Sequence, residues 1–411
     1  MDRSTDSHAS TRRRYLATGG SLLGTALGAG CFGDGDPGSG GAESTPTQTP
    51  TETETPAATE TERTDNGPYS VSISPMGEVH FDEPPETIFT RLTHHADMAF
   101  ALGLGDAINA MHAPDYYDGL WNQYVERLPG VELDWTGLYS SWQPSKEKLY
   151  ALDSDVHLAD PAWIGVQQAW DRDDLDDVAE EISPWFGNSL SDRNVEPQVE
   201  WVEDYEYYTL WDQFEIVAEL FQEQARYQAL AEVHDELMTT IEAGVPSESE
   251  RPTAIMIAAA DIDEIYTYLV SAPGFLNSHV RPFGPRDAYE GEVGNNTVVD
   301  MEAILDADPD VILHLGGMEP GTDMAARREA FQEDPVARQA TAVQNGRVYA
   351  QGARYQGPIL NLFQLEMTAK QLYPDVFGEW PTYDAGPYPE IPTEEQLFDR
   401  QRVADAINGN L

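Results

Sequence analysis

The sequence contains a single cysteine, Cys31, in 411 residues. Disulfides within the chain, cysteine-rich zinc sites and Cys–Cys redox chemistry are therefore excluded. Basic residues are also scarce, because 23 Lys and Arg stand against 73 Asp and Glu, which gives a formal net charge of −50. A chain this acidic repels phosphate backbones and anionic bilayers, so nucleic-acid binding is excluded as a function.

The excess of carboxylates favours adaptation to molar salt, where screening removes most of the repulsion among them. The alternative is an acidic protein that is adapted to ordinary salt concentrations. Disorder throughout the chain is not expected, because hydrophobic residues make up 40% and aromatic residues 10% of the sequence. This composition is sufficient for packed cores.

Motifs of the common enzyme classes are missing. The segment Gly103-Leu-Gly105-Asp lacks the third glycine of a dinucleotide-binding loop. No nucleophile elbow, phosphate-binding P-loop or His-Glu-x-x-His sequence occurs. We therefore expect a protein that is not an enzyme and has no cofactor. A secreted hydrolase stays open as an alternative of another class, since carboxylates are too abundant here to be diagnostic.

The first 31 residues predict export. Residues 11–16 read TRRRYL, which resembles a twin-arginine (Tat) signal with Arg12 and Arg13 as the pair. The following stretch is too short and too rich in glycine to span a membrane. Small residues before Cys31 resemble a lipobox, although Leu27 stands four places before the cysteine instead of the usual three. We expect Cys31 to be lipidated after Tat export, which would hold the protein on the outer face of the cell membrane by its lipid alone.

Residues 32–68 are rich in Thr, Pro, Gly, Ser and Glu and predict a disordered tether. The remaining residues are enough for two domains. Strand and helix patterns alternate in residues 69–205 and again in residues 246–411, which predicts two α/β lobes. Between them, residues 206–245 carry a helical apolar period and predict a linking helical segment.

An internal echo relates the two lobes. Residues 147–156 read EKLYALDSDV, and residues 302–311 read EAILDADPDV. Both copies place a Glu six residues before an Asp, followed by Asp-Val and an apolar strand. One copy lies on each side of the helical segment, which favours two lobes of similar construction.

In this order the motifs resemble those of the substrate-binding proteins of ABC importers for ferric siderophores and cobalamin, the class III periplasmic binding proteins. The resemblance covers about residues 69–380 and rests on five segments: PETIFT at 85–90, AFALGLGD at 99–106, the two copies of the echo, and NGRVYA at 345–350. It implies two Rossmann-like α/β lobes joined by a long helix, with a ligand cleft between them.

The resemblance also implies a function without chemistry. A monomer would capture a ferric siderophore or related iron chelate between the lobes and deliver it to an ABC permease dimer. In this family each lobe presents a surface Glu to the permease, and the matching residues here are Glu147 and Glu302.

Ligands of open α/β folds collect beyond the carboxyl ends of the strands. Aromatic faces and a guanidinium group suit a flat, partly anionic chelate. For each aromatic residue, a place in the core is the alternative. The candidates are His94, His95, Tyr116, Tyr117, Trp142, Trp163, Tyr268, Arg354 and Tyr355.

Direct metal binding is the main alternative within the same fold. His94 and His95 are expected to open a helix after the first strand of the lobe, where imidazole groups would bind bare Zn²⁺ or Mn²⁺. A haem or cobalamin receptor also stays open. His157 and His314 lie inside apolar runs and are expected in the core.

Overall fold

The computed structural model describes residues 67–411 apart from 260–263 and 290–292. The predicted export signal at Arg12 and Arg13, the predicted lipidation site at Cys31 and nearly all of the predicted tether lie outside the described residues. The described part begins with an antiparallel hairpin of β1 (Tyr69–Ile73) and β2 (Gly77–Phe81), as the alternating sequence predicts.

The N-terminal lobe is built on a parallel four-stranded sheet in the order β5-β4-β3-β6. Its strands are β3 (Ile88–Thr90), β4 (Ile108–Met111), β5 (Tyr139–Ser140) and β6 (Val156–Leu158). Its helices are α1 (Thr93–Ala101), η1 (Gly105–Ala107), α2 (Pro114–Val125), α3 (Lys146–Leu152), α4 (Pro161–Gln168), α5 (Arg172–Glu181) and η2 (Leu190–Asp192). The strands are short and apolar, and β3 and β6 are buried throughout, as expected for a sheet covered on both faces.

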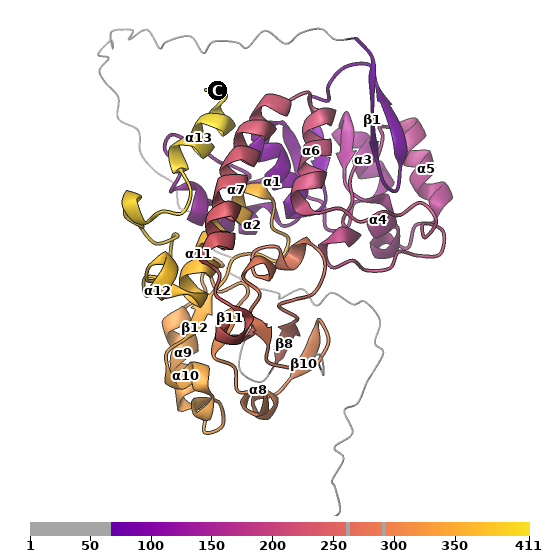
Figure 1. The fold of residues 1–411 in the computed structure, drawn as a ribbon. Helices are drawn as coiled ribbons and strands as arrows, with labels where there is room; N and C mark the ends of the chain where they lie inside the picture. The colour runs from indigo at the N-terminus through magenta and orange to yellow at the C-terminus, as the bar shows by residue number, and fades with distance from the viewer. Residues whose placement is uncertain (1–66, 260–263, 290–292) are drawn as a thin grey trace, which may run out of the picture. The chain divides into compact units, whose positions relative to one another are not determined.

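The C-terminal lobe is built on a mixed sheet in the order β10-β8-β7-β11-β12, with β9 beside β7. Its strands are β7 (Thr253–Ala259), β8 (Ile265–Tyr268), β9 (Arg286–Asp287), β10 (Thr297–Val299), β11 (Val311–His314) and β12 (Val348–Ala350). Its helices are η4 (Phe275–Asn277), η5 (Arg281–Phe283), α8 (Met301–Ala307), α9 (Met324–Glu333), η6 (Ala337–Gln339) and α10 (Thr341–Gln344). In Figure 1, α8, α9 and α10 lie with this sheet in the orange part of the chain.

The linking segment contains two helices, α6 (Leu210–Leu220) and α7 (Gln224–Gly244), followed by the short η3 (Glu248–Glu250). The sequence pattern runs through as one apolar period, but the structure breaks it where Gln222 adopts a left-handed φ of 56°. Thr209 and Asp212 form a reciprocal capping box at the start of α6. The long helix α7 buries Leu230, Val233, Leu237 and Ile241, which lie on one face at helical spacing.

The last elements are α11 (Pro358–Leu372), α12 (Pro374–Phe377), η7 (Thr393–Glu395) and α13 (Arg400–Asn408). Every residue of α11 is buried, so this helix lies at the centre of the described part of the chain. The helix α13 packs against α7 and α1. Figure 1 shows α13 in yellow beside α7.

The echo in the sequence corresponds to one repeated structure. In the N-terminal lobe, Asp155 Oδ2 accepts hydrogen bonds from Thr87 N at 2.8 Å and Thr87 Oγ1 at 2.9 Å. In the C-terminal lobe, Asp310 Oδ2 accepts the same pair from Thr253 at the same distances. We call each pair an Asp–Thr clasp. Each clasp fastens the start of a strand to the neighbouring parallel strand, β6 to β3 and β11 to β7.

Within the described residues, no helix combines the length and the apolar character that a membrane span needs.

Candidate cleft between the lobes

The carboxyl ends of the N-terminal strands bring a buried arginine between two tryptophans. Arg91 follows β3 and is 1% exposed. Its guanidinium carbon lies 4.4 Å from the centre of the Trp142 ring and 4.5 Å from that of Trp163, which places the cation between two aromatic faces. Trp142 follows β5, and Trp163 lies in the first turn of α4, after β6. Parallel strands end at one edge of the sheet, so these distant residues meet there.

Arg91 retains unused hydrogen-bond donors. Its Nη2 donates to the carbonyl oxygen of Trp142 at 3.0 Å. Its Nε and Nη1 are buried and have no hydrogen-bond partner among the described residues. Burial lowers the pKa of Arg91 to about 10, so the group stays charged at neutral pH. A buried charge with unused donors costs free energy, and an anionic group that binds there recovers it.

The start of α2 adds two tyrosines to the same edge. Tyr116 and Tyr117 follow β4, and their ring centroids lie 4.9 Å apart. The ring of His112 lies 5.4 Å from Tyr117 and stacks on Trp142 at 4.5 Å. Tyr116 is the more open of the tyrosine pair, with 38% of its surface exposed. Burial raises the pKa of Tyr117, and so does its proximity to Tyr355 of the other lobe.

The C-terminal lobe contributes Arg354 and Tyr355, which follow β12. Arg354 Nη2 donates to the Tyr355 hydroxyl at 2.5 Å, while its buried Nε has no partner among the described residues. Burial lowers the pKa of Arg354, but Tyr355, Tyr268 and Asp192 raise it, and the net change is upward. Asp192 belongs to η2 of the N-terminal lobe, so the charges of the two lobes act on one another here. Tyr268 is buried at the end of β8.

His94 and His95 open α1, as the sequence predicts, and both are fully buried. Their ring centroids lie 3.9 Å apart, and His94 packs 5.0 Å from the ring of Phe275 in the C-terminal lobe. Burial lowers the pKa of His94 well below its usual value, and that of His95 to about 3. Both rings are therefore neutral at ordinary pH and lie in the seam where the lobes meet.

The structure brings most of the predicted site residues into one cluster. Tyr116, Tyr117, Trp142, Trp163, Arg354 and Tyr355 lie at the strand ends that face the seam, and Tyr268 joins them from within β8 instead of from the predicted loop. Glu147 and Glu302 lie elsewhere, exposed in the first turns of α3 and α8. The ligand contacts of the cluster stay a prediction.

Three members of the cluster were not predicted: Arg91, His112 and Asp192. Arg91 lies within residues 87–92, TIFTRL, a mainly apolar run typical of a buried strand, so the sequence does not separate its charge from the sheet. The signal that could have found it is a guanidinium at the carboxyl end of a buried strand, a place where no core residue needs a charge.

No group of three or more His, Cys, Asp or Glu side chains among residues that the structure describes is arranged to hold a metal ion.

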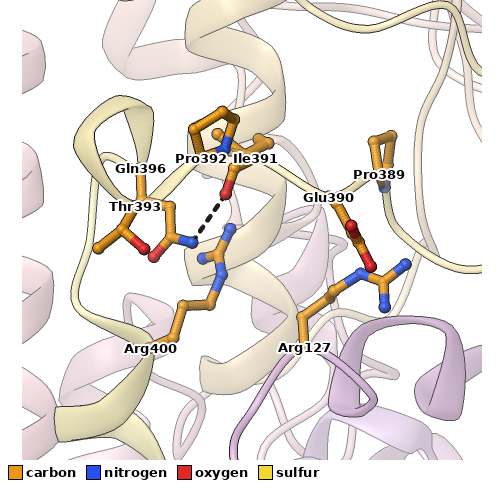
Figure 2. Close-up of a pocket in the computed structure, with 8 residues that line it drawn as sticks. All are labelled: Arg127, Pro389, Glu390, Ile391, Pro392, Thr393, Gln396 and Arg400. Carbon is orange, nitrogen blue, oxygen red and sulfur yellow. Dashed lines mark hydrogen bonds between the residues drawn. The ribbon is translucent and has the colours of Figure 1, made fainter.

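A separate cavity of about 360 Å³ lies between Arg127 and the segment that leads into α13 (Figure 2). Its two arginines are bound by other parts of the protein, although Arg400 Nη1 has no partner among the described residues. Arg127 Nε donates to the Tyr388 carbonyl at 2.6 Å, and Arg400 forms an ion pair with the buried Glu366 at 2.5 Å. None of the predicted site residues lines this cavity, which is bounded by the residues labelled in Figure 2. It belongs to the packing of the C-terminal segment.

Solved structures share this fold. A periplasmic binding protein from Veillonella parvula has 13% sequence identity and a TM-score of 0.54, over 77% of this chain and 94% of that chain. The petrobactin-binding protein YclQ from Bacillus subtilis has 14% identity and a TM-score of 0.52, over 74% and 99%. The siderophore-binding protein BauB, bound to acinetobactin and ferric iron, has 18% identity and a TM-score of 0.51, over 72% and 96%. A search of curated proteins finds no significant match.

The family assignment rests on the sequence itself. The family model described as "Periplasmic binding protein" matches residues 93–355, which is well over half of the chain. The matched part begins at α1 and ends at Tyr355, so it contains every strand of the two sheets except β3. The two lobes, their helical link and this match lead to one conclusion: the chain belongs to the periplasmic binding protein family.

Proposed function

We propose that this protein is the extracytoplasmic receptor of an ABC importer and captures a ferric siderophore or a related iron chelate that carries negative charge. The observation that carries the proposal is Arg91, a buried cation between Trp142 and Trp163 whose Nε and Nη1 have no hydrogen-bond partner among the described residues. Stacking on the tryptophans and charge-assisted hydrogen bonds to the guanidinium suit a flat chelate with anionic oxygens. The structural neighbours named for petrobactin and acinetobactin support this ligand class.

Capture requires both lobes. Arg91 comes from the N-terminal lobe and Arg354 from the C-terminal lobe, and each keeps a buried donor without a partner among the described residues. A ligand that accepts from both would stabilise the closed arrangement by its differential affinity. Delivery then consists of docking and opening, with no covalent step.

The test is titration of the purified protein with ferric chelates of different charge, followed by tryptophan fluorescence. We expect an anionic ferric tris-catecholate to bind and a neutral ferric tris-hydroxamate to bind more weakly. Arg91→Ala should weaken the tris-catecholate by about 1.5–3 kcal/mol, the scale of a lost charged hydrogen bond. Arg354→Ala should cost less, since Arg354 already donates to Tyr355.

A matched control is Arg172→Ala. Arg172 also stacks on a tryptophan, with its guanidinium carbon 4.3 Å from the Trp201 ring, but it lies on α5 outside the cluster. This change should leave chelate binding intact.

Tight binding of bare Zn²⁺ or Mn²⁺ that is lost with His94→Ala or His95→Ala would favour the metal-receptor alternative instead. Turnover of a substrate would favour a hydrolase.

The placement on the cell surface is also part of the proposal. It rests on the Arg12–Arg13 pair, on Cys31 after small residues, and on the polar tether. Cys31→Ala should release the protein from membranes into the medium, and unchanged membrane association of this variant would remove lipidation from the account.

The net charge of −50 supports a function in molar salt. The screening length grows from about 3 Å at 1 M to about 10 Å at 0.1 M, so the melting temperature should fall on dilution of the salt.

A further inference from the structure

One of the places where the two lobes meet is a backbone contact between two short helical turns. Gly274 precedes η4 of the C-terminal lobe and has φ 95° and ψ 165°, a conformation that residues with a side chain rarely adopt. It lies directly against η2 of the N-terminal lobe, which ends at Asp192.

A side chain at residue 274 has no room. A Cβ atom there would lie 2.6 Å from the carbonyl carbon of Asp192 and 2.7 Å from the amide nitrogen of Arg193, in addition to its contact with the Asp192 oxygen. All of these are backbone atoms, so no rotamer change relieves the overlap. The absence of a side chain therefore sets how near η4 comes to η2.

This contact is connected to the side-chain cluster from both lobes. In the C-terminal lobe, Gln356 Nε2 donates to the carbonyl oxygens of Phe275 at 2.9 Å and Leu276 at 2.8 Å. Gln356 directly follows Tyr355, so η4 and the Arg354–Tyr355 pair are held together. In the N-terminal lobe, burial raises the pKa of the Asp192 carboxyl, while its neighbour Arg193 and then Arg354 of the other lobe lower it.

We propose that Gly274 is a positioning residue of the closed cleft: because it lacks a side chain, the lobes approach far enough for Arg91 and Arg354 to act on the same ligand. The inference rests on the proposed function for its ligand, but the contact itself is a property of the chain alone. A side chain at residue 274 separates η4 from η2, and Arg354 moves away with η4.

The first experiment needs no ligand. Spin labels on Tyr150→Cys in α3 and Val298→Cys in β10 report the distance between the lobes, since these residues are 47% and 54% exposed. All samples carry the full chain with Cys31→Ser. We expect Gly274→Ala to shift the distance distribution away from that of the parent. An unchanged distribution would overturn the proposal.

The matched control is Gly378→Ala. Gly378 has φ 87° and ψ 156°, nearly the conformation of Gly274, but its only neighbour within 4 Å of an added Cβ is the Lys370 Nζ atom at 3.0 Å. The control therefore carries the same backbone strain without the clash between the lobes. Its distance distribution should match the parent. If both variants shift it equally, strain and not the contact is responsible, and the proposal fails.

The second experiment measures affinity for a ferric tris-catecholate. If the closed population falls to about a tenth in Gly274→Ala, the apparent Kd rises about tenfold, while Gly378→Ala keeps the parent value. Equal affinity of all three proteins would contradict the proposal. If the parent itself binds no chelate, the proposed function fails, and the label distances still decide the role of Gly274.

Hydrogen exchange on the unaltered protein decides the matter if Gly274→Ala does not fold. Residues 190–193 and 274–277 pack against one another, so a separation of the lobes should expose both segments. We expect the amides of the two segments to exchange at matching rates, as one opening unit. Clearly different rates would show that the segments open independently and would overturn the inference.

Discussion

The two lobes use the same support and build different sites on it. Each fastens a strand start with an Asp–Thr clasp, Asp155 to Thr87 in one lobe and Asp310 to Thr253 in the other. In each, the preceding helix ends at a left-handed aspartate, Asp153 with φ 49° and Asp308 with φ 41°.

The lobes differ in the elements that follow β3 and β7, the strands that the two clasps hold. In the N-terminal lobe, β3 is followed by Arg91 and the buried helix α1, and all four strands are parallel. In the C-terminal lobe, β8 runs antiparallel to its neighbours β7 and β10, so this sheet is mixed. The N-terminal lobe supplies most of the aromatic side chains, and the C-terminal lobe supplies mainly Arg354 and Tyr355. The two lobes therefore share the residues that support their strands and differ in the residues that follow the strands, where the candidate site lies.

The largest expected difference concerns Asp97, a buried residue of α1 that hydrogen-bonds across the seam. Its Oδ2 accepts from Leu360 N at the start of α11 at 3.1 Å. Burial raises its pKa from 3.8 to about 7, although that hydrogen bond lowers it. The folded state then binds a proton that the unfolded state releases, so stability falls as the pH rises from about 4 to about 7.

Asp97→Asn keeps an acceptor for Leu360 N and removes the charge. The variant should gain stability over the parent as the pH rises through that window, by on the order of 4 kcal/mol above pH 7. Urea unfolding at pH 4.5 and pH 8 measures this difference. A gain that is the same at both pH values would show that the carboxyl is not the cause.

The clasps themselves should differ by a smaller amount. Asp310 is half-buried and Asp155 is exposed, although their hydrogen bonds have the same lengths. Asp310→Ala should destabilise the protein by about 2 kcal/mol and Asp155→Ala by about 1 kcal/mol, because water replaces lost bonds more readily at an exposed site. Urea midpoints test this order, with the exposed Asp306→Ala of α8 as the control. The reverse order would mean that the lobes are not supported alike.

The smallest effect on the purified protein is expected for the repeated glutamates. Glu147 and Glu302 occupy equivalent positions in the first turns of α3 and α8. As partners of their own helix ends they are worth a few tenths of a kcal/mol. We propose that they dock on the permease, where such charges steer association and fix register. The double variant Glu147→Ala with Glu302→Ala should keep chelate affinity and lose uptake in cells. Normal uptake would defeat the docking role.

The sequence predicts the scaffold well because apolar periods and the echo are local signals. The apolar strands predicted after the two copies of the echo are β6 and β11. The break at Gln222 was missed, since a single left-handed residue leaves the apolar spacing of α6 and α7 unchanged. The position of Tyr268 at the end of β8 was likewise not predicted, because nothing in the sequence indicates an antiparallel strand after β7.

The site is only partly predictable for a different physical reason. Trp142, Trp163 and Arg354 could be found because each follows a recognisable strand. From the sequence, Arg91 could not be distinguished from the residues of its strand, because its neighbours Thr90 and Leu92 are part of the same run and are buried with it. Its role depends on two tryptophans more than 50 residues away, Trp142 and Trp163, and on which side of the sheet edge they reach. Such a meeting is a property of the fold and is not written in any one segment.

The packing of α13 has a consequence for synthesis of the protein. This helix covers α1 and α7, with Arg402 bound to Glu236 at 2.6 Å and Arg226 of α7 bound to the carbonyl oxygen of Ile407. On a ribosome, α1 emerges some 300 residues before α13. A nascent chain therefore carries the apolar surface of α1 uncovered until residue 408 has left the exit tunnel. Holding factors would be needed throughout translation, and truncated products should be recognised by proteases through that same surface.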